Sequence, residues 1–260
     1  MTEELVHLDV AGGIATITLD SPTNRNALSR QVMSELSQRF QTALGDEHAR
    51  VIVLTGAGPV FCSGADLKEQ RAANEAGEPT GPGALVPTLT AMLNSPKPII
   101  GRINGAARAG GLGLVAACDI AVAAESASFA VSEVRVGVIP AIISVILLPK
   151  IGMAKSMELF LTGEPFSAEE AVAMGLLTAA APLDGLDGKV AHYVNAVLKG
   201  SPSALAGAKA LVRDVPGMET ATAFASMADR SAYFFASEDA REGMAAFAEK
   251  RAPNWAPPNA

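Results

Sequence analysis

The alternation of apolar and polar residues predicts that the chain opens with a β-hairpin. Residues 5–10 and 14–19 form two short strand-like runs with partial alternation. Gly12 and Gly13 lie between them, and glycine adopts the positive backbone angles of a two-residue hairpin turn without strain. We therefore expect two antiparallel strands at the start of the fold.

A helix and a buried strand are predicted next, which makes the opening mixed α/β. Ser29 can accept a hydrogen bond at the start of the helix, and Gly45 suits its end. Between them the apolar residues recur every three or four positions; they are Val32, Met33, Leu36, Phe40 and Leu44. Residues 51–54 contain no polar side chain, as is typical of a strand buried on both faces.

The middle of the chain continues the α/β pattern after a polar interruption. Residues 69–82 are polar, rich in glycine and proline and without clear periodicity, which predicts a mobile surface loop whose role as a lid stays open. Further strands are predicted at residues 99–100 and 119–123, and residues 110–117 are small and apolar. The α/β part therefore extends to about residue 138.

Helical patterns dominate the second half of the chain. Ser167 and Glu170 have the spacing of a capping box, and Gly175 suits the end of the short helix that follows. Further helices are predicted over residues 187–198, 203–213, 218–235 and 237–250. We expect an α/β core over residues 1–190 and a C-terminal helical region over residues 191–260.

Composition narrows the class of protein. The 260 residues are 49% hydrophobic, which is enough to bury a large core without disulfides. The formal net charge of -7 disfavours nucleic acids and anionic membrane surfaces as partners. The two cysteines and the absence of zinc-site spacing indicate a reducing, cytoplasmic location and no metal. The first seven residues lack a secretory-signal pattern, and the longest apolar run, residues 136–149, is too short to span a membrane.

Two glycine-flanked segments are the strongest candidates for a binding site. They cover residues 61–67 and 104–111, and the second leads into a predicted helix. Small residues let a ligand approach main-chain N–H groups, and the start of a helix adds unpaired donors that stabilise a carbonyl oxygen gaining negative charge. Tight turns and close packing explain the glycines equally well, so both interpretations stay open. Neither a Ser/His/Asp triad nor a nucleophilic Cys62 is supported by the sequence.

Taken in order with several other stretches, these segments resemble the crotonase superfamily of enoyl-CoA hydratases and isomerases over nearly the whole chain. The other stretches are Asn24-Arg25-Asn26-Ala27-Leu28, Cys118-Asp119-Ile120, Ser132-Glu133, Gly137-Val138-Ile139-Pro140, Leu161-Thr162-Gly163-Glu164, residues 171–177, and the tail with Gly243, Phe247 and Lys250. The resemblance implies an α/β fold of repeated ββα turns that form a spiral. It also implies C-terminal helices that cover the site and build a homotrimer, often paired into a hexamer.

The resemblance implies an acyl-CoA thioester as the substrate. By motif position, the thioester oxygen would accept hydrogen bonds from the main-chain N–H groups of Ala65 and Gly110. No metal or redox cofactor is implied. The residues implied to bind coenzyme A, the last two of them on a neighbouring subunit, are Arg25, Ala27, Ser63, Asp66, Leu67, Phe247 and Lys250.

The chain departs from the family pattern at one catalytic position. A typical hydratase has two glutamates; the second is present as Glu133, but the first position, three residues after Gly110, is Gly113. One carboxylate is enough to add water to a 2-enoyl-CoA, or to move a double bond between the 3 and 2 positions. We place an enoyl-CoA hydratase first. A 3,2-enoyl-CoA isomerase and an acyl-CoA-binding protein without catalysis are the alternatives.

Two further departures concern the choice of substrate, to which Arg108 and Gly113 are candidate contacts. Arg108 stands where many relatives have an apolar residue. Turned inward it would pair with a second carboxylate, as in a glutaconyl-type CoA ester; turned outward, as we expect, it is a solvated charge or a subunit contact. Ile142 and Ile143 replace a glycine-rich turn, so they either narrow the acyl pocket or pack in the core.

Overall fold

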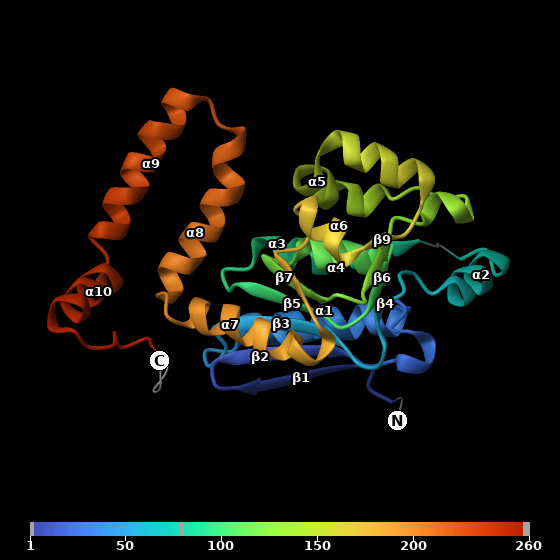
Figure 1. Ribbon diagram of the computed structural model, residues 1–260, viewed down its shortest axis with the longest axis horizontal. Coiled ribbons are helices and arrows are strands. Elements are labelled where there is room, and N and C mark those ends of the chain that lie inside the picture. The colour runs from blue at the N-terminus through green and yellow to red at the C-terminus, as the bar shows by residue number, and fades with distance from the viewer. Residues whose placement is uncertain (1–2, 79–80, 257–260) are drawn as a thin grey trace.

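The protein forms two β-sheets with helices wound around them (Figure 1). The computed structural model describes residues 3–78 and 81–256. The larger sheet has the strand order β1-β2-β3-β5-β7-β10, and the smaller sheet has the order β4-β6-β8-β9. The strands are β1 (Val6–Ala11), β2 (Ile14–Leu19), β3 (Val51–Gly56), β4 (Val60–Cys62), β5 (Ile99–Ile103), β6 (Ala106–Arg108), β7 (Ile120–Ala124), β8 (Ser128–Ala130), β9 (Phe166–Ser167) and β10 (Ala179–Ala181).

Helices follow pairs of strands and then form the C-terminal part. They are α1 (Arg30–Gly45), α2 (Leu67–Glu75), α3 (Leu85–Asn94), α4 (Gly110–Ala117), α5 (Ala141–Thr162), α6 (Ala168–Ala173), α7 (Leu186–Leu198), α8 (Pro202–Asp214), α9 (Thr220–Phe235) and α10 (Glu238–Glu249). The pairs β3-β4, β5-β6 and β7-β8 each place one strand in the larger sheet and the next in the smaller sheet, and helices follow each pair. This repetition confirms the expected spiral of ββα turns.

Elements with a strong local pattern are confirmed. Gly12 and Gly13 have φ values of +59° and +85° and join β1 to β2 as an antiparallel hairpin. Ser29 accepts a hydrogen bond from the first turn of α1. Ser167 and Glu170 form both hydrogen bonds of the capping box at the start of α6. In each case the interacting residues are only a few positions apart, so the sequence pattern was enough to predict the turn or the cap.

The first half of the loop predicted over residues 69–82 is a helix instead, so the prediction was wrong for residues 69–75. Asp66 begins α2 by accepting hydrogen bonds from two main-chain N–H groups of its first turn. The helix is polar on nearly all sides and buries only Ala73, so no apolar period marked it in the sequence. An ion pair between Arg71 and Glu75, one turn apart, supports the exposed face. Residues 79 and 80 of the segment lie outside the described residues.

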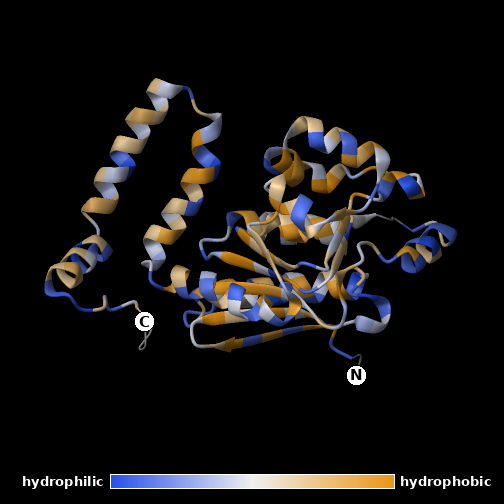
Figure 2. Ribbon diagram, in the orientation of Figure 1, coloured by the Kyte–Doolittle hydropathy of each residue, from blue (hydrophilic) through white to orange (hydrophobic). Residues whose placement is uncertain are grey.

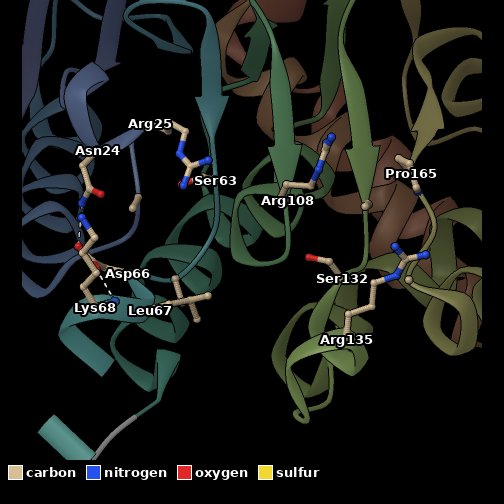
Figure 3. Close-up of a pocket in the computed structure, with 14 residues that line it drawn as sticks. Asn24, Arg25, Ser63, Asp66, Leu67, Lys68, Arg108, Ser132, Arg135 and Pro165 are labelled. Atoms are coloured by element: carbon tan, nitrogen blue, oxygen red, sulfur yellow. Dashed lines mark hydrogen bonds between the residues drawn. The ribbon is translucent and has the colours of Figure 1, made fainter. Parts of the chain in front are cut away.

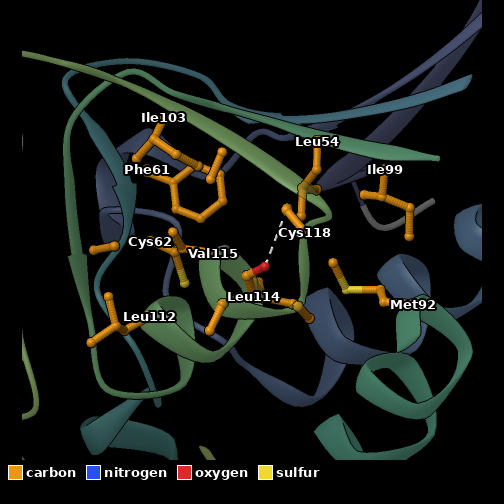
Figure 4. Packing of buried hydrophobic residues seen from close by; sticks show 14 of the residues in the cluster. Leu54, Phe61, Cys62, Met92, Ile99, Ile103, Leu112, Leu114, Val115 and Cys118 are labelled. Atoms are coloured by element: carbon orange, nitrogen blue, oxygen red, sulfur yellow. Dashed lines mark hydrogen bonds between the residues drawn. The ribbon is translucent and has the colours of Figure 1, made fainter. Parts of the chain in front are cut away.

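Helix α4 passes through the centre of the core. Residues 111–117 are all buried, and Figure 4 shows the apolar side chains around them, including Leu54 and Met92. The helix lies against β4 because Gly111 has no side chain: a Cβ there would lie 2.6 Å from the carbonyl oxygen of Cys62. Burial raises the pKa of Cys62 to about 12, which keeps the thiol protonated and unreactive.

Helices α8, α9 and α10 extend away from the sheets as an arm (Figure 1). Lys209 joins α8 to the core through an ion pair with Asp119 at 2.8 Å. Arg50 donates hydrogen bonds to the carbonyl oxygens of Leu198 and Gly200, where the arm begins. The four predicted C-terminal helices are confirmed to within a few residues at each end. The boundary expected at residue 190 falls inside α7, which packs against β5 and β7.

Hydrophobic residues occur along all three arm helices (Figure 2), and several of their side chains are exposed. Phe224 on α9 is 75% exposed, and Phe247 on α10 is 88% exposed. No helix in residues 3–78 and 81–256 is long and apolar enough to cross a membrane.

Candidate active site

Three short parallel strands bring candidate residues to one edge of the smaller sheet. β4 pairs with β6, and β6 pairs with β8, all in parallel. The carboxyl ends of parallel strands lie at the same edge of a sheet, where ligands of α/β proteins usually bind. Ala65 follows β4, Gly110 follows β6 and Glu133 follows β8. The sheet therefore gathers three of the implied site residues that are far apart in the sequence.

Ala65 and Gly110 belong to adjoining main-chain segments. A Cβ at Gly64 would lie 2.9 Å from the Cβ of Ala109 and 2.9 Å from the carbonyl oxygen of Arg108. Gly110 is the first residue of α4, so its N–H has no acceptor within the helix. Ala109 before it has φ +48° and ψ -121°, a strained conformation that costs a non-glycine residue about 1–3 kcal/mol. Strain held at the start of a helix in this way is typical of a ligand site.

Asn26 fixes the loop that faces these segments. Its side chain is fully buried; it accepts a hydrogen bond from one main-chain N–H and donates to two main-chain carbonyl oxygens, over 2.8–2.9 Å. Arg25 and Asn26 have positive φ values of +54° and +53°, a conformation that asparagine adopts more readily than most residues. The N–H of Ser63 donates to the carbonyl oxygen of Arg25 at 3.1 Å, which joins this loop to the segment of Ala65.

A cavity of about 560 Å³ opens between two walls at this edge (Figure 3). Its lining includes seven of the predicted site residues: Arg25, Ala27, Ser63, Ala65, Asp66, Leu67 and Arg108. It also includes four polar residues that the sequence analysis did not assign to the site, although each lies within two positions of a residue that it did assign: Asn24, Lys68, Ser132 and Arg135. Glu133, Gly110 and Gly113 are not part of this lining.

Asp66 has a structural role in addition to lining the cavity. Burial opposes ionisation of its carboxyl group, but hydrogen bonds from the N–H of Glu69, from the Asn24 side chain at 2.7 Å and from the N–H of Lys68 together hold its pKa below the ordinary value. The carboxylate is thus ionised and occupied as the cap of α2. Both of its oxygen atoms accept hydrogen bonds, and its negative charge forms part of the cavity wall.

Phe247 and Lys250 are not brought to the cavity of their own chain. Phe247 lies on α10 and Lys250 directly follows that helix, at the end of the arm remote from α2 (Figure 1). Both side chains are exposed. A role in binding coenzyme A therefore requires a neighbouring subunit, as the resemblance implies.

Glu133 is a half-buried carboxylate with one oxygen unpaired. It begins a short 3-10 helix, Glu133–Val136, just beyond β8. Its Oε2 atom is buried and has no hydrogen-bond partner among the described residues. Burial raises the pKa of this carboxyl group above its ordinary value, and the main-chain N–H of the same residue opposes the shift. A carboxyl group whose pKa is raised is suited to accepting and returning a proton.

The space beside Gly113, where the resemblance implies a glutamate in a typical hydratase, is filled by a side chain from α5. A Cβ at Gly113 would lie 2.6 Å from Cγ2 of Ile143 and 3.9 Å from Cδ1 of Leu89. Ile143 is buried in the core, and Ile142 is partly buried and packs against the same core. Of the two interpretations of these isoleucines, core packing is what the structure shows. Gly113 and Ile143 thus form one packed contact in place of a carboxylate.

Arg108 lines the cavity and does not extend freely into solvent, so it is not the solvated charge that was one of the expectations. Ala107 is fully buried, and successive side chains of a strand point to opposite faces, so Arg108 is turned away from the core; there it lines the cavity. Its guanidinium donates hydrogen bonds to the hydroxyl of Ser128 at 2.7 Å and to the carbonyl oxygen of Ala107 at 3.0 Å, and also to the carbonyl oxygen of Ser128. The neighbouring strand β8 therefore holds the side chain against the cavity wall.

Within the described ranges, no group of three His, Cys, Asp or Glu side chains could hold a metal ion. The chemistry that this edge offers is instead main-chain hydrogen-bond donors, one buried carboxylate and a cavity with several cationic side chains.

Known proteins are similar to this chain in sequence and fold over most of their length. The family model described as enoyl-CoA hydratase/isomerase matches residues 9–258. An enoyl-CoA hydratase from Mycobacterium smegmatis is 34% identical, with a TM-score of 0.89 over 97% of this chain and 99% of that one. An enoyl-CoA hydratase from Shewanella pealeana is 30% identical, with a TM-score of 0.90 over 96% of both chains. The rat mitochondrial enoyl-CoA hydratase domain-containing protein 3 is 33% identical over 94% of this chain and 81% of its own. With this fold and these matches, the chain belongs to the enoyl-CoA hydratase/isomerase (crotonase) family.

Proposed function

We propose that this protein is an enoyl-CoA hydratase that adds water to a 2-enoyl-CoA to give a 3-hydroxyacyl-CoA. The observation that carries the proposal is the convergence at one sheet edge of the Ala65 and Gly110 segments with the half-buried carboxylate of Glu133, whose Oε2 atom is unpaired among the described residues. Main-chain N–H groups and one carboxylate are the parts that this addition needs.

In the proposed reaction, Glu133 is the only acid and base. Water loses a proton to the Glu133 carboxylate as its oxygen bonds to carbon 3. The electron pair of the double bond moves toward the thioester, whose oxygen gains negative charge and is stabilised by the N–H groups of Ala65 and Gly110. Protonated Glu133 then returns one proton to carbon 2. Only water and protons are transferred, so the reaction needs neither a metal nor a redox cofactor.

The cavity is the proposed site for coenzyme A. Of the residues proposed to bind it, those on one wall are Arg25, Ala27, Ser63, Asp66 and Leu67, all of which line the cavity. Phe247 and Lys250 are proposed to reach the coenzyme A of a neighbouring subunit. Local positive charge suits the phosphates of this ligand even though the protein as a whole is acidic.

Isomerisation of a 3-enoyl-CoA is a second candidate, and the packing of Ile143 over Gly113 favours it. This contact leaves an apolar surface where a second carboxylate would otherwise help to hold the attacking water. An isomerase needs only one base, which removes a proton from carbon 2 and returns it to carbon 4, or the reverse.

The test is to incubate the purified protein with crotonyl-CoA and follow the loss of enoyl-thioester absorbance. A sustained, enzyme-dependent loss supports hydration. No loss with crotonyl-CoA, together with a gain of the same absorbance from a 3-enoyl-CoA, supports isomerisation. Binding of both compounds without either reaction would contradict both candidates and indicate an acyl-CoA-binding protein.

The proposed role of the Gly110 N–H can be tested by comparing two substitutions. Gly110→Pro is expected to lower kcat about 100-fold to 1,000-fold relative to Gly110→Ala, because proline removes the donor. Both substitutions add a Cβ that would lie 2.8 Å from Cδ1 of Leu28, so alanine controls for crowding. Proline fits the first position of a helix, so α4 should persist in circular dichroism spectra. Equal rates for the two variants would contradict the role.

We also propose a homotrimer, or a hexamer built from two trimers. Phe224 is 75% exposed on the arm, and Met153 is 80% exposed on α5, as are further apolar residues of both elements. Exposed apolar surface on this scale marks an interaction site. Light scattering after gel filtration is expected to give three or six chains, and Phe224→Lys is expected to shift the protein toward smaller species. A monomer at micromolar concentration would contradict the proposal.

A further inference from the structure

Arg108 differs from the other cations of the cavity in being held in place by the fold. It ends β6 and lies two residues before Gly110. Two residues span roughly 7 Å at most, so its Cα lies close to the start of α4. Its side chain is half-buried and lines the cavity on the wall opposite Arg25 (Figure 3).

The hydrogen bonds of Arg108 leave part of its guanidinium free. A guanidinium has five N–H donors. Three are used: two on Nη1, to the carbonyl oxygens of Ala107 and Ser128, and one on Nη2, to the hydroxyl of Ser128. The two that remain, one on Nε and one on Nη2, have no partner in the part of the chain that the structure describes. Two such neighbouring nitrogens suit two oxygens of one phosphate or carboxylate.

The charge of Arg108 is not balanced by the protein. All of its partners are neutral, and no carboxylate of the described residues lies within 4.0 Å of it. Burial lowers the pKa of this guanidinium, but an arginine stays charged at neutral pH. Burying a charge without a counter-ion is unfavourable, so a ligand that supplies one would gain affinity.

The whole cavity has the same imbalance. Arg25, Lys68 and Arg135 line it together with Arg108, and none of the four forms an ion pair within the described residues. The one carboxylate in the lining is Asp66, which already caps α2. A local excess of positive charge in a chain of net charge -7 indicates an anionic ligand.

We propose that Arg108 is a binding residue for an anionic oxygen group of the acyl-CoA ligand. Such a group has two sources: the phosphates of coenzyme A, and a carboxylate at the far end of the acyl group. The proposal rests on the proposed function only in taking an acyl-CoA as the ligand, and it does not depend on which reaction follows.

Equilibrium binding of unreactive saturated ligands tests this without turnover. Calorimetry would give the Kd of butyryl-CoA, of butyryl-pantetheine, which has no phosphate, and of glutaryl-CoA, which adds a carboxylate. These would be measured for the unchanged protein and for Arg108→Leu. Arg108→Gln is a second variant that removes the charge and keeps hydrogen-bond donors to Ser128, in case leucine disturbs folding. Lys189→Leu, at an exposed position on α7, controls for net charge.

If the phosphates are the partner, Arg108→Leu is expected to raise the Kd of butyryl-CoA about tenfold to a hundredfold and leave that of butyryl-pantetheine unchanged. If a carboxylate is the partner, only the Kd of glutaryl-CoA is expected to rise by that factor. Equal weakening of all three ligands, or no change in any, would overturn the proposal. Failure of the unchanged protein to bind butyryl-CoA would overturn the proposed function itself, which separates the two failures.

Discussion

Replacing Glu133 by glutamine is expected to lower kcat with crotonyl-CoA by about 100-fold to 10,000-fold, the usual contribution of a general acid and base. Glutamine keeps the size of the side chain and cannot accept or return the proton. The first glutamate of a typical hydratase is absent, since its position is Gly113, which is packed against Ile143. The Kd of butyryl-CoA is expected to stay within a few-fold of its original value, since Glu133 does not line the cavity.

The same substitution has an expected effect on stability that activity loss alone would not show. Burial raises the pKa of Glu133 in the folded protein above its unfolded value. The neutral carboxyl group therefore contributes stability at pH values below its pKa in the unfolded chain. That stability is lost as the pH rises through its pKa in the folded protein. Above that range a buried charge opposes folding, so Glu133→Gln is expected to have a higher Tm than the unchanged protein.

The pH dependence of the rate provides a third measurement. The free carboxylate is the form that accepts a proton from water, so kcat/KM is expected to rise with pH through the raised pKa of Glu133. Glu125→Gln, at an exposed position after β7, is the matched control and is expected to leave rate and Tm unchanged. A Glu133→Gln variant with full activity would contradict the single-carboxylate mechanism.

Restoring a glutamate at position 113 is expected to succeed only when Ile143 is made smaller. Gly113→Glu alone places a Cβ 2.6 Å from Cγ2 of Ile143 and buries a carboxylate in an apolar contact, so a large loss of Tm is expected. Gly113→Glu combined with Ile143→Ala opens space for the side chain. Hydration of crotonyl-CoA by the double variant is expected to exceed that of the unchanged protein about 100-fold, because a second acid-base group then holds the water.

Ile143→Ala alone is the control for this pair. It is expected to reduce the free energy of unfolding by about 2–5 kcal/mol through the cavity that it leaves, without a gain in rate. Rates would be measured beside thermal melts, so that activity can be expressed per folded protein. A folded double variant no faster than Ile143→Ala would contradict the view that Gly113 marks the place of a catalytic carboxylate.

Local patterns determined several of the helices and strands of this protein. The Gly12-Gly13 turn, the cap at Ser29 and the capping box of Ser167 and Glu170 were predicted from residues a few positions apart, and all are present. The order of motifs along the chain also identified the family before the arrangement in space was known. Such signals are readable because a hydrogen bond within one turn needs no partner from elsewhere in the chain.

Tertiary structure decided which residues come together at the candidate active site. β4, β6 and β8 have three residues each, too few for a pattern, yet their parallel pairing places Ala65, Gly110 and Glu133 at one edge. α2 was missed because it buries one alanine and has no apolar face.

The two departures from the family pattern also could not be interpreted from the sequence alone. The sequence contains Gly113 and Ile143 as separate substitutions, and only the packing of α4 against α5 shows that one fills the space left by the other. Arg108 was expected to face solvent, and it lies along the cavity because the parallel strand β8 offers it a hydroxyl and a carbonyl oxygen. Both outcomes depend on contacts between residues 20 or more positions apart, and periodicity along a chain holds no information about such contacts.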